Sequence, residues 1–524
     1  MRRPMQRRQL MLLLSRRAAA LALASLWART AAAQDGAAPR LVQDPFTLGV
    51  ASGMPRPESV VLWTRLAPRP HEPGGGLPPL PVPVRWELAE DERFSAGLRH
   101  GRVDAQPQHA HSVHVKVEGL VPGRTYHYRF FAGDAASPVG RTRTAPAADA
   151  PVDRLRFALA SCQHYEQGWY AAHREIAARE LDFVLFVGDY IYETNRPREQ
   201  VRAHEGPEPV TLEAYRARHA TYKLDADLRA AHAAHPWLLT WDDHEVENDY
   251  AGDAGSDGLD TAAFLRRRTA AYKAYFEHLP VAPVPPAAEG PYHVHDRYAW
   301  GALAELWLAD GRQFRSLQAC NAPGRAGGRV LASCDELAAP ARTMFGAAQE
   351  RWLESGLGAS RAQWKLLAQG TQISSSGIDT PLGRRIYTDG WDGYPAARER
   401  LLEALHARRL QDVLCLGGDV HRHVAADLRA RPNDRASPVV ASEFVCTSVT
   451  SRGLPEAMVA LIRASNPDIA HARSDERGYV LVEIDRQAAR ADFRATPHPA
   501  AADARLHSQA RFAVAAGQPG VLRD

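Results

Sequence analysis

The stretch Asp182-Phe183-Val184-Leu185-Phe186-Val187-Gly188-Asp189-Tyr190-Ile191-Tyr192 decides how this chain is organised. Residues 182–187 are almost wholly apolar and have the length of a buried strand. Gly188 then opens a turn from which Asp189 and Tyr192 project, three residues apart. A carboxylate at that place can bridge two metal ions, and a tyrosine phenolate can bind one of them. Together these hard anionic donors suit Fe(III) above all.

Three further strand-like runs also end in groups that bind metals. Residues 155–160 are followed by Ser161-Cys162-Gln163, residues 237–241 by Asp242-Asp243-His244-Glu245-Val246-Glu247-Asn248, and residues 412–416 by Gly417-Gly418-Asp419-Val420-His421. In α/β sheets, ligands gather at the carboxyl ends of strands. Each cluster alone is more typical of a turn or a helix cap than of a metal site. Four of them in one domain predict a hydrolytic centre with two metal ions.

The apolar pattern divides the chain into two domains. Residues 42–146 hold short β runs between Pro- and Gly-rich turns, and residues 120–130 resemble the corner and following strand of a fibronectin type III sandwich. A linker at 145–151 leads to residues 152–510, where strands alternate with helices and indicate an α/β domain. Further strands are expected at 304–309, 364–368 and 479–484, and helices at 170–179, 261–277, 347–357 and 396–407.

The N-terminus has the pattern of an export signal over residues 1–33. Two arginine pairs, Arg7-Arg8 and Arg16-Arg17, precede or flank short apolar runs, and Ala31-Ala32-Ala33 forms a small-residue cleavage site. Paired arginines are typical of substrates of the twin-arginine export machinery, so we expect a periplasmic or secreted protein. Which pair is recognised stays open. The apolar runs are short for a membrane anchor, and we find no other stable membrane span.

The net charge and the cysteines agree with the prediction of a periplasmic or secreted protein. The chain has a formal charge of +3, but residues 1–33 contribute seven arginines and no acid. The mature protein would therefore be mildly acidic, with no basic stripe suited to nucleic acid. In an oxidising compartment Cys320 and Cys334 would form a disulfide around a Gly-rich loop, the alternative being two free thiols. Cys415 and Cys446 lie inside apolar runs and are expected to be inert core thiols.

Taken together, the clusters resemble the metallophosphoesterase superfamily, with three departures. Cys162 stands where an early Asp or His is usual, Asp243-His244-Glu245 where Asn-His-Glu is usual, and Gly418-Asp419-Val420-His421 where Gly-His-x-His is usual. These departures are similar to the alkaline phosphatase D (PhoD) family, as are the β-rich N-terminal domain, Trp241–Asn248 and Asp389-Gly390-Trp391-Asp392-Gly393-Tyr394. The resemblance covers nearly the whole mature chain. It implies a metallophosphoesterase-like sandwich of sheets flanked by helices, preceded by a fibronectin type III-like domain.

The resemblance also implies a cofactor of Fe(III) with one or two Ca²⁺ ions. Thiolate, phenolate, shared carboxylate and imidazole would hold the iron, and an oxygen-only set would suit Ca²⁺. The expected iron ligands are Cys162, Asp189, Tyr192 and His421, and the expected calcium ligands are Asp189, Asp243, Asp392 and Asp419. Asp242 competes with Asp243 for this role, and Asp392 is equally typical of a turn. Asn248 would either ligate a metal or phosphate, or orient a neighbour, or only bond to local backbone.

The predicted activity is hydrolysis of phosphomonoesters, phosphodiesters or both by a metal-activated hydroxide. Asp189 would be central to catalysis, and His244 would bind the phosphate or protonate the leaving oxygen. A different class remains open, namely a non-enzymatic periplasmic or surface binding protein built on the same domains. The natural substrate and the oligomeric state cannot be deduced from these patterns.

Overall fold

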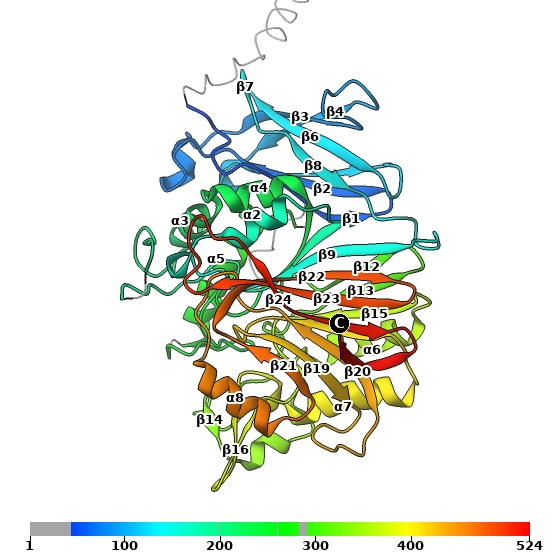
Figure 1. The fold of residues 1–524 in the computed structure, drawn as a ribbon. Coiled ribbons are helices and arrows are strands. Elements are labelled where there is room, and N and C mark those ends of the chain that lie inside the picture. The colour runs from blue at the N-terminus through cyan, green and yellow to red at the C-terminus, as the bar shows by residue number, and fades with distance from the viewer. Residues whose placement is uncertain (1–42, 199, 259, 282–290) are drawn as a thin grey trace, which may run out of the picture.

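Two large β-sheets packed face to face form the centre of the computed structural model, which describes residues 43–198, 200–258, 260–281 and 291–524 (Figure 1). The expected export signal, residues 1–33, lies outside the described residues. The first sheet has ten strands, in the spatial order β25 (Gln518–Arg523), β24 (His507–Ala515), β23 (Ala488–Pro497), β22 (Glu476–Asp485), β9 (Arg154–Ala160), β10 (Phe183–Val187), β11 (Pro236–Thr240), β1 (Val50–Arg56), β2 (Ser59–Arg65) and β5 (Ser112–Glu118). The second has seven, in the order β12 (Asp296–Trp300), β13 (Ala304–Leu308), β15 (Trp364–Ala368), β18 (Val413–Gly417), β20 (Val439–Val445), β19 (His423–Arg429) and β21 (Ile469–Arg473).

Helices cover the outer faces of both sheets. The ten-stranded sheet packs against α2 (Ala171–Ala177), α3 (Leu212–Lys223), α4 (Ala226–Ala234) and α5 (Thr261–His278). The seven-stranded sheet packs against α6 (Ala347–Ala359), α7 (Pro395–Ala407) and α8 (Glu456–Ser465). The Asp260 carboxylate caps α5 by accepting a hydrogen bond from the Ala263 N–H, which explains why that helix begins at Thr261. The predicted sandwich of sheets flanked by helices is confirmed.

Strand β10 shows why the central runs are apolar throughout. Phe183, Leu185 and Val187 point into the core between the two sheets, while Val184 and Phe186 point toward the helices. Successive side chains of a strand alternate between faces, so a strand buried on both sides needs apolar residues at every position. It pairs in parallel with β9 and with β11, which places their three carboxyl ends side by side.

The N-terminal β region is a sandwich, but it shares one sheet with the rest of the chain. Its own sheet has the order β4 (Arg99–Ala105), β3 (Val82–Ala89), β6 (Thr125–Ala132), β7 (Ala135–Ala136), with β8 (Gly140–Arg143) paired to β6. The facing layer is β1, β2 and β5, and β1 pairs in parallel with β11. The expected corner is present, since the Tyr126 hydroxyl accepts a hydrogen bond of 2.9 Å from the Val121 N–H. The 145–151 segment leads from β8 of this five-stranded sheet to β9 of the ten-stranded sheet, which strands from before and after the segment build together.

The last strand predicted from the sequence ends at residue 484. In the structure β23, β24 and β25 extend the ten-stranded sheet, so the boundary expected at residue 510 falls inside β24 and the sheet continues to Arg523. A small fourth sheet, β14 (Val330–Leu331), β17 (Gly383–Tyr387) and β16 (Ile378–Thr380), lies beside α8 (Figure 1). Of the helices in the described part of the chain, none combines the length and apolar character needed to cross a membrane.

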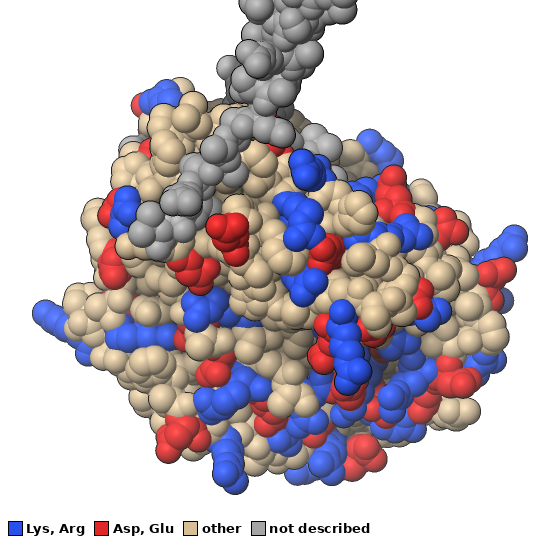
Figure 2. Space-filling view, turned by 90° about the horizontal axis from the view of Figure 1, so that it is seen from above, with Lys and Arg blue, Asp and Glu red and all other residues tan. Residues whose placement is uncertain are grey.

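The face seen in Figure 2 carries basic and acidic side chains side by side. Among the described residues on that face the two signs intermingle, and neither gathers into a broad stripe.

Candidate metal centre

The carboxyl ends of β9, β10, β11 and β18 bring the predicted ligands together. The loops after β9 and β10 are tied to each other, because the Cys162 N–H donates to the Gly188 carbonyl and the Gln163 N–H to the Asp189 carbonyl, each at 3.1 Å. Two groups of residues offer ligand atoms that lie within 4.8 Å of one another: Cys162, Asp189 and His421, and Asp189, Asp243 and His244. Asp189 belongs to both groups, which is the arrangement expected of a bridging carboxylate.

Tyr192 completes the first group. Its hydroxyl donates a hydrogen bond of 2.7 Å to Asp189 Oδ2 and lies 3.0 Å from His421 Nε2. His421 Nδ1 lies 2.8 Å from the Arg452 carbonyl oxygen, an acceptor that requires the ring hydrogen to be on Nδ1. The Nε2 lone pair is therefore directed to Tyr192, as in a metal-binding histidine whose second nitrogen is held by the backbone.

Glu193 orients the second group. Glu193 Oε2 lies 2.6 Å from His244 Nδ1, and Oε1 accepts a hydrogen bond of 2.8 Å from the Asn248 N–H. Burial lowers the pKa of His244, but the carboxylates of Glu193, Asp243 and Asp189 outweigh it and raise the pKa well above its ordinary value. The surrounding carboxylates therefore favour the charged form of His244, which can donate a hydrogen bond or a proton.

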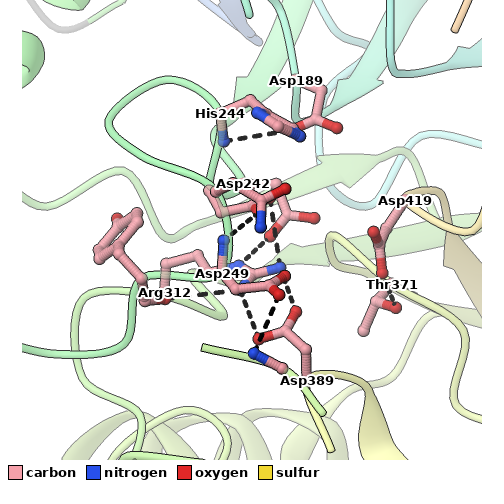
Figure 3. A network of polar contacts seen from close by, with 12 residues as sticks. Asp189, Asp242, His244, Asp249, Arg312, Thr371, Asp389 and Asp419 are labelled. Atoms are coloured by element: carbon pink, nitrogen blue, oxygen red, sulfur yellow. Dashed lines mark hydrogen bonds and ion pairs between the residues drawn. The ribbon is translucent and has the colours of Figure 1, made fainter. Parts of the chain in front are cut away.

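A network of aspartates around Arg312 lies beside both groups (Figure 3). The Arg312 guanidinium bonds Asp242, lies 2.8 Å from Asp389 Oδ2 and 3.4 Å from Asp243 Oδ1. Across the site, Thr371 donates a hydrogen bond to Asp419. Arg312 and Arg315 are the arginines that pair with aspartates of this network. Six aspartates converge here, five of them buried and Asp419 half-buried: Asp189, Asp242, Asp243, Asp249, Asp389 and Asp419.

The backbone at these positions is strained. Cys162, Asp189, Asp249, Asp419 and His421 all have φ between 51° and 62°, a region that residues other than glycine rarely adopt. Such strain clusters where a surrounding structure holds side chains for function. The glycines of the same turns permit close contact: a Cβ on Gly188 would lie 2.5 Å from Asp242 Cβ, and one on Gly418 would lie 2.4 Å from Ser161 Oγ.

The donor set fits metal ions. Burial, with the neighbouring carboxylates, raises the pKa of Asp242 to about 7 and that of Asp419 to about 6, and it raises that of Asp189 well above its ordinary value. Burial and the Asp189 carboxylate likewise raise the pKa of the Cys162 thiol. Asp242 Oδ2 and Asp243 Oδ1 are buried without a hydrogen-bond partner. Buried anions with so few counter-ions require cations to stay ionised, and bound metal ions supply that charge.

Not every predicted site residue lies in these groups. Asp392 is the correction: its Oδ1 pairs with Arg398 at 2.7 Å and its Oδ2 accepts the Ser376 N–H at 2.9 Å. Asp389, three residues earlier in the same motif, is the aspartate that joins the network around Arg312. Asn248 is half-buried, and its main-chain N–H is engaged by Glu193. Asp242 and Asp243 both face Arg312, so the choice between them stays open.

Several site residues were missed by the sequence analysis. Arg312 follows strand β13, and the strand end Asp310-Gly311-Arg312 carries polar groups after an apolar run, as the other four strand ends do. Asp249 directly follows the 242–248 cluster, and Glu193 directly follows Tyr192. Tyr387, which donates a hydrogen bond to Asp249 Oδ2, comes from β17 and carried no local signal.

The Cys320–Cys334 disulfide is formed, with the two Cα atoms 6.7 Å apart. The loop it closes reaches the acidic network, because the Gly328 N–H donates to Asp249 Oδ2 and the Gly327 N–H to the Gln318 side chain, which bonds Asp389. Cys162, Cys415 and Cys446 are buried free thiols.

Comparisons with known proteins identify the family of this chain. The family model described as PhoD-like phosphatase matches residues 157–493, and the model described as PhoD-like phosphatase, N-terminal domain, matches residues 26–146. This chain belongs to the PhoD-like phosphatases. It is 43% identical over 497 residues to alkaline phosphatase D of Bacillus subtilis (strain 168), covering 93% of this chain and 84% of that protein. A solved structure of PhoD has 41% identity and a TM-score of 0.87, with 93% of each chain covered.

Membership in the PhoD-like phosphatases confirms the predicted family, fold class and enzyme class. The chain is a homologue of alkaline phosphatase D, and thus a phosphoric ester hydrolase of a family that uses metal ions. The two residue groups that share Asp189 are where the structure offers ligands for them.

Proposed function

We propose that this chain is an exported phosphoesterase that hydrolyses phosphomonoesters, phosphodiesters or both at a centre of Fe(III) with one or two Ca²⁺ ions. The observation that carries the proposal is the pair of ligand groups that share the Asp189 carboxylate. Cys162, Tyr192 and His421 would hold iron with Asp189, since thiolate, phenolate and imidazole favour Fe(III). Asp243 and Asp419, with Asp242 as the alternative to Asp243, would hold calcium with Asp189, since Ca²⁺ takes only oxygen ligands.

Bound metal ions would lower the pKa of a water and neutralise charge on the phosphoryl group. The remaining roles belong to the protein. His244, protonated and held by Glu193, is assigned to bind a phosphoryl oxygen or to donate a proton to the leaving oxygen. Arg312 holds Asp242 and Asp389 in place. Its positive charge reduces the repulsion between these two carboxylates.

Metal analysis of the purified protein beside Asp189→Asn tests this assignment. We expect near-stoichiometric iron, calcium and a broad visible charge-transfer band in the wild type. The substitution should remove the metals and lower activity by more than about 100-fold, because even residues behind the ligands change metal affinity by about 10–100-fold. Retained iron with full activity in Asp189→Asn would contradict the assignment. Zinc alone, or no metal and no band, would overturn the assignment of Fe(III) with Ca²⁺.

Export by the twin-arginine machinery to the periplasm or medium is part of the same proposal, supported by the arginine pairs of residues 1–33. Transport of a folded protein suits a centre that is loaded before translocation. We expect replacement of one pair, Arg7-Arg8 or Arg16-Arg17, by lysines to retain the precursor in the cytoplasm, while replacement of the other has little effect. Fractionation of the cells measures this, and unchanged export with both pairs replaced would refute it.

A further inference from the structure

A cavity of about 720 Å³ opens beside the candidate metal centre, and Asp419 and His421 form part of its wall. This volume lies within the range of roughly 300–1,000 Å³ that is typical of sites for small organic ligands. A molecule whose phosphorus is held at the metal centre therefore has its other substituents next to this cavity.

Most of the remaining wall is apolar and comes from the β16–β17 hairpin and from α8. Ile378 and Ile386 belong to the hairpin, and Met458 and Leu461 belong to α8. The hairpin and the helix are tied together, since the Asp379 N–H donates to Ser465 Oγ at 2.9 Å and the Asn466 side chain donates to the Gly377 carbonyl at 2.7 Å. Figure 1 shows α8 beside β14 and β16 at one end of the molecule.

Three large apolar side chains of this wall, Val330, Met458 and Leu461, are not needed to pack the core. Val459 and Ile462 are the residues through which α8 covers the seven-stranded sheet, and both are buried. Met458 and Leu461 are 40% and 50% exposed on the same helix, and Val330 of β14, also in the wall, is 67% exposed. Large apolar side chains that gather at the mouth of a cavity mark a ligand-binding surface.

We propose that the cavity binds an apolar substituent, an alkyl chain or an aryl ring, on the same phosphate ester that reacts at the metal centre. The inference rests on the proposed function and gives it a substrate class, namely phosphodiesters with one hydrophobic alcohol. The continuity of the cavity with Asp419 and His421 selects this occupant over a separate partner, because whatever fills the cavity is adjacent to the reacting phosphate.

The test uses the methyl, octyl and phenyl esters of 4-nitrophenyl phosphate as dispersed monomers with the metal-loaded protein. In each reaction a water oxygen bonds to phosphorus, the bond to 4-nitrophenolate breaks, and a monoester remains, so the leaving group is constant. We expect kcat/KM for the octyl or the phenyl ester to exceed that for the methyl ester by roughly tenfold or more, since burial of about two methylenes would supply that factor. The preferred ester tells which of the two apolar groups the cavity accepts.

Substitutions of exposed residues in the wall test whether the preference for apolar esters arises in this cavity. Met458→Ser and Leu461→Ser should lower kcat/KM for the apolar ester at least threefold more than kcat/KM for the methyl ester. Leu80→Ser, at a 63% exposed leucine of the N-terminal region, is the matched control and should alter neither. Equal kcat/KM for the three esters in the wild type, or an equal loss on all of them in the α8 variants, would overturn the inference alone. Hydrolysis of the monoester 4-nitrophenyl phosphate but of none of the three diesters would also overturn the inference alone. Failure to hydrolyse the monoester and all three diesters would overturn the proposed function as well.

Discussion

Asp392 and Asp389 lie three residues apart in one motif and have different partners. Asp389 bonds Arg312, Arg315 and Gln318 within the acidic network, whereas Asp392 is buried against Arg398 and the Ser376 N–H. A buried carboxylate with an arginine of its own has less charge to offer a metal ion. The contacts therefore assign Asp392 to holding the start of α7 in place and Asp389 to supporting the centre.

The substitution Asp392→Asn tests this difference. We expect unchanged metal content but a loss of about 3–5 kcal/mol in the free energy of unfolding at neutral pH, because Arg398 stays buried without its partner. Burial raises the pKa of Asp392, but Arg398 and the Ser376 N–H outweigh it, so the net shift is downward. A lowered pKa in the folded state means that this stabilisation is present above the unfolded value of about 3.9 and is lost as the pH falls through the folded value.

Denaturant unfolding of the wild type and the variant, at neutral pH and at stepwise lower pH, measures both effects. The difference between the two proteins should shrink as the solution becomes acidic. Loss of metal from Asp392→Asn at unchanged stability would instead return Asp392 to the ligand set.

The strands and their polar ends were predictable because each carries its signal locally. Strand β15 runs from Trp364 to Ala368 as expected, and β9, β10, β11 and β18 agree within about a residue, since central strands need unbroken apolar runs. Cys162, Asp189 and His421 meet because the carboxyl ends of such strands converge. Tyr387 and Glu193 could not be found this way, because their roles depend on which loops pack together across the site.

The disulfide loop between Cys320 and Cys334 is an element whose function is indirect. It presents the Gly328 N–H to Asp249 and braces Gln318 against Asp389. Closing a loop of about 15 residues limits the unfolded chain and is worth about 3 kcal/mol in the entropy model. The loop therefore stabilises the acidic network from outside the ligand set.

Replacing both cysteines by serine should weaken metal retention by about tenfold, as residues behind metal ligands do. Chelator titration followed by metal analysis measures this. Equal retention in the wild type and the Cys320→Ser/Cys334→Ser variant would show that the loop does not support the centre.

The continuous ten-stranded sheet is a property of the whole molecule that the domain pattern concealed. The sequence pattern of β1, β2 and β5 predicts strands of a separate sandwich. In the structure, however, β1 pairs with β11, whose carboxyl end carries Asp242 and Asp243. Contacts between distant segments reinforce this: the Trp63 indole N–H donates to the Glu277 carbonyl, and Arg65 bonds His278 at the end of α5. Only the pairing of strands far apart in the chain could reveal this sheet.

Removal of the N-terminal strands should therefore damage the catalytic part. A chain of residues 152–524 would leave β11 as an unpaired edge and expose the apolar surfaces that β1 and β2 cover, so we expect it to aggregate and to lose its metal. Cleavage at a protease site placed in the 145–151 linker is the matched control, because it cuts the covalent link but keeps the strand pairing. The nicked protein should elute as one species with full metal content in gel filtration. A soluble, metal-loaded 152–524 fragment would instead show that the sheet from β9 onward is stable by itself and that its pairing with β1 contributes little to the site.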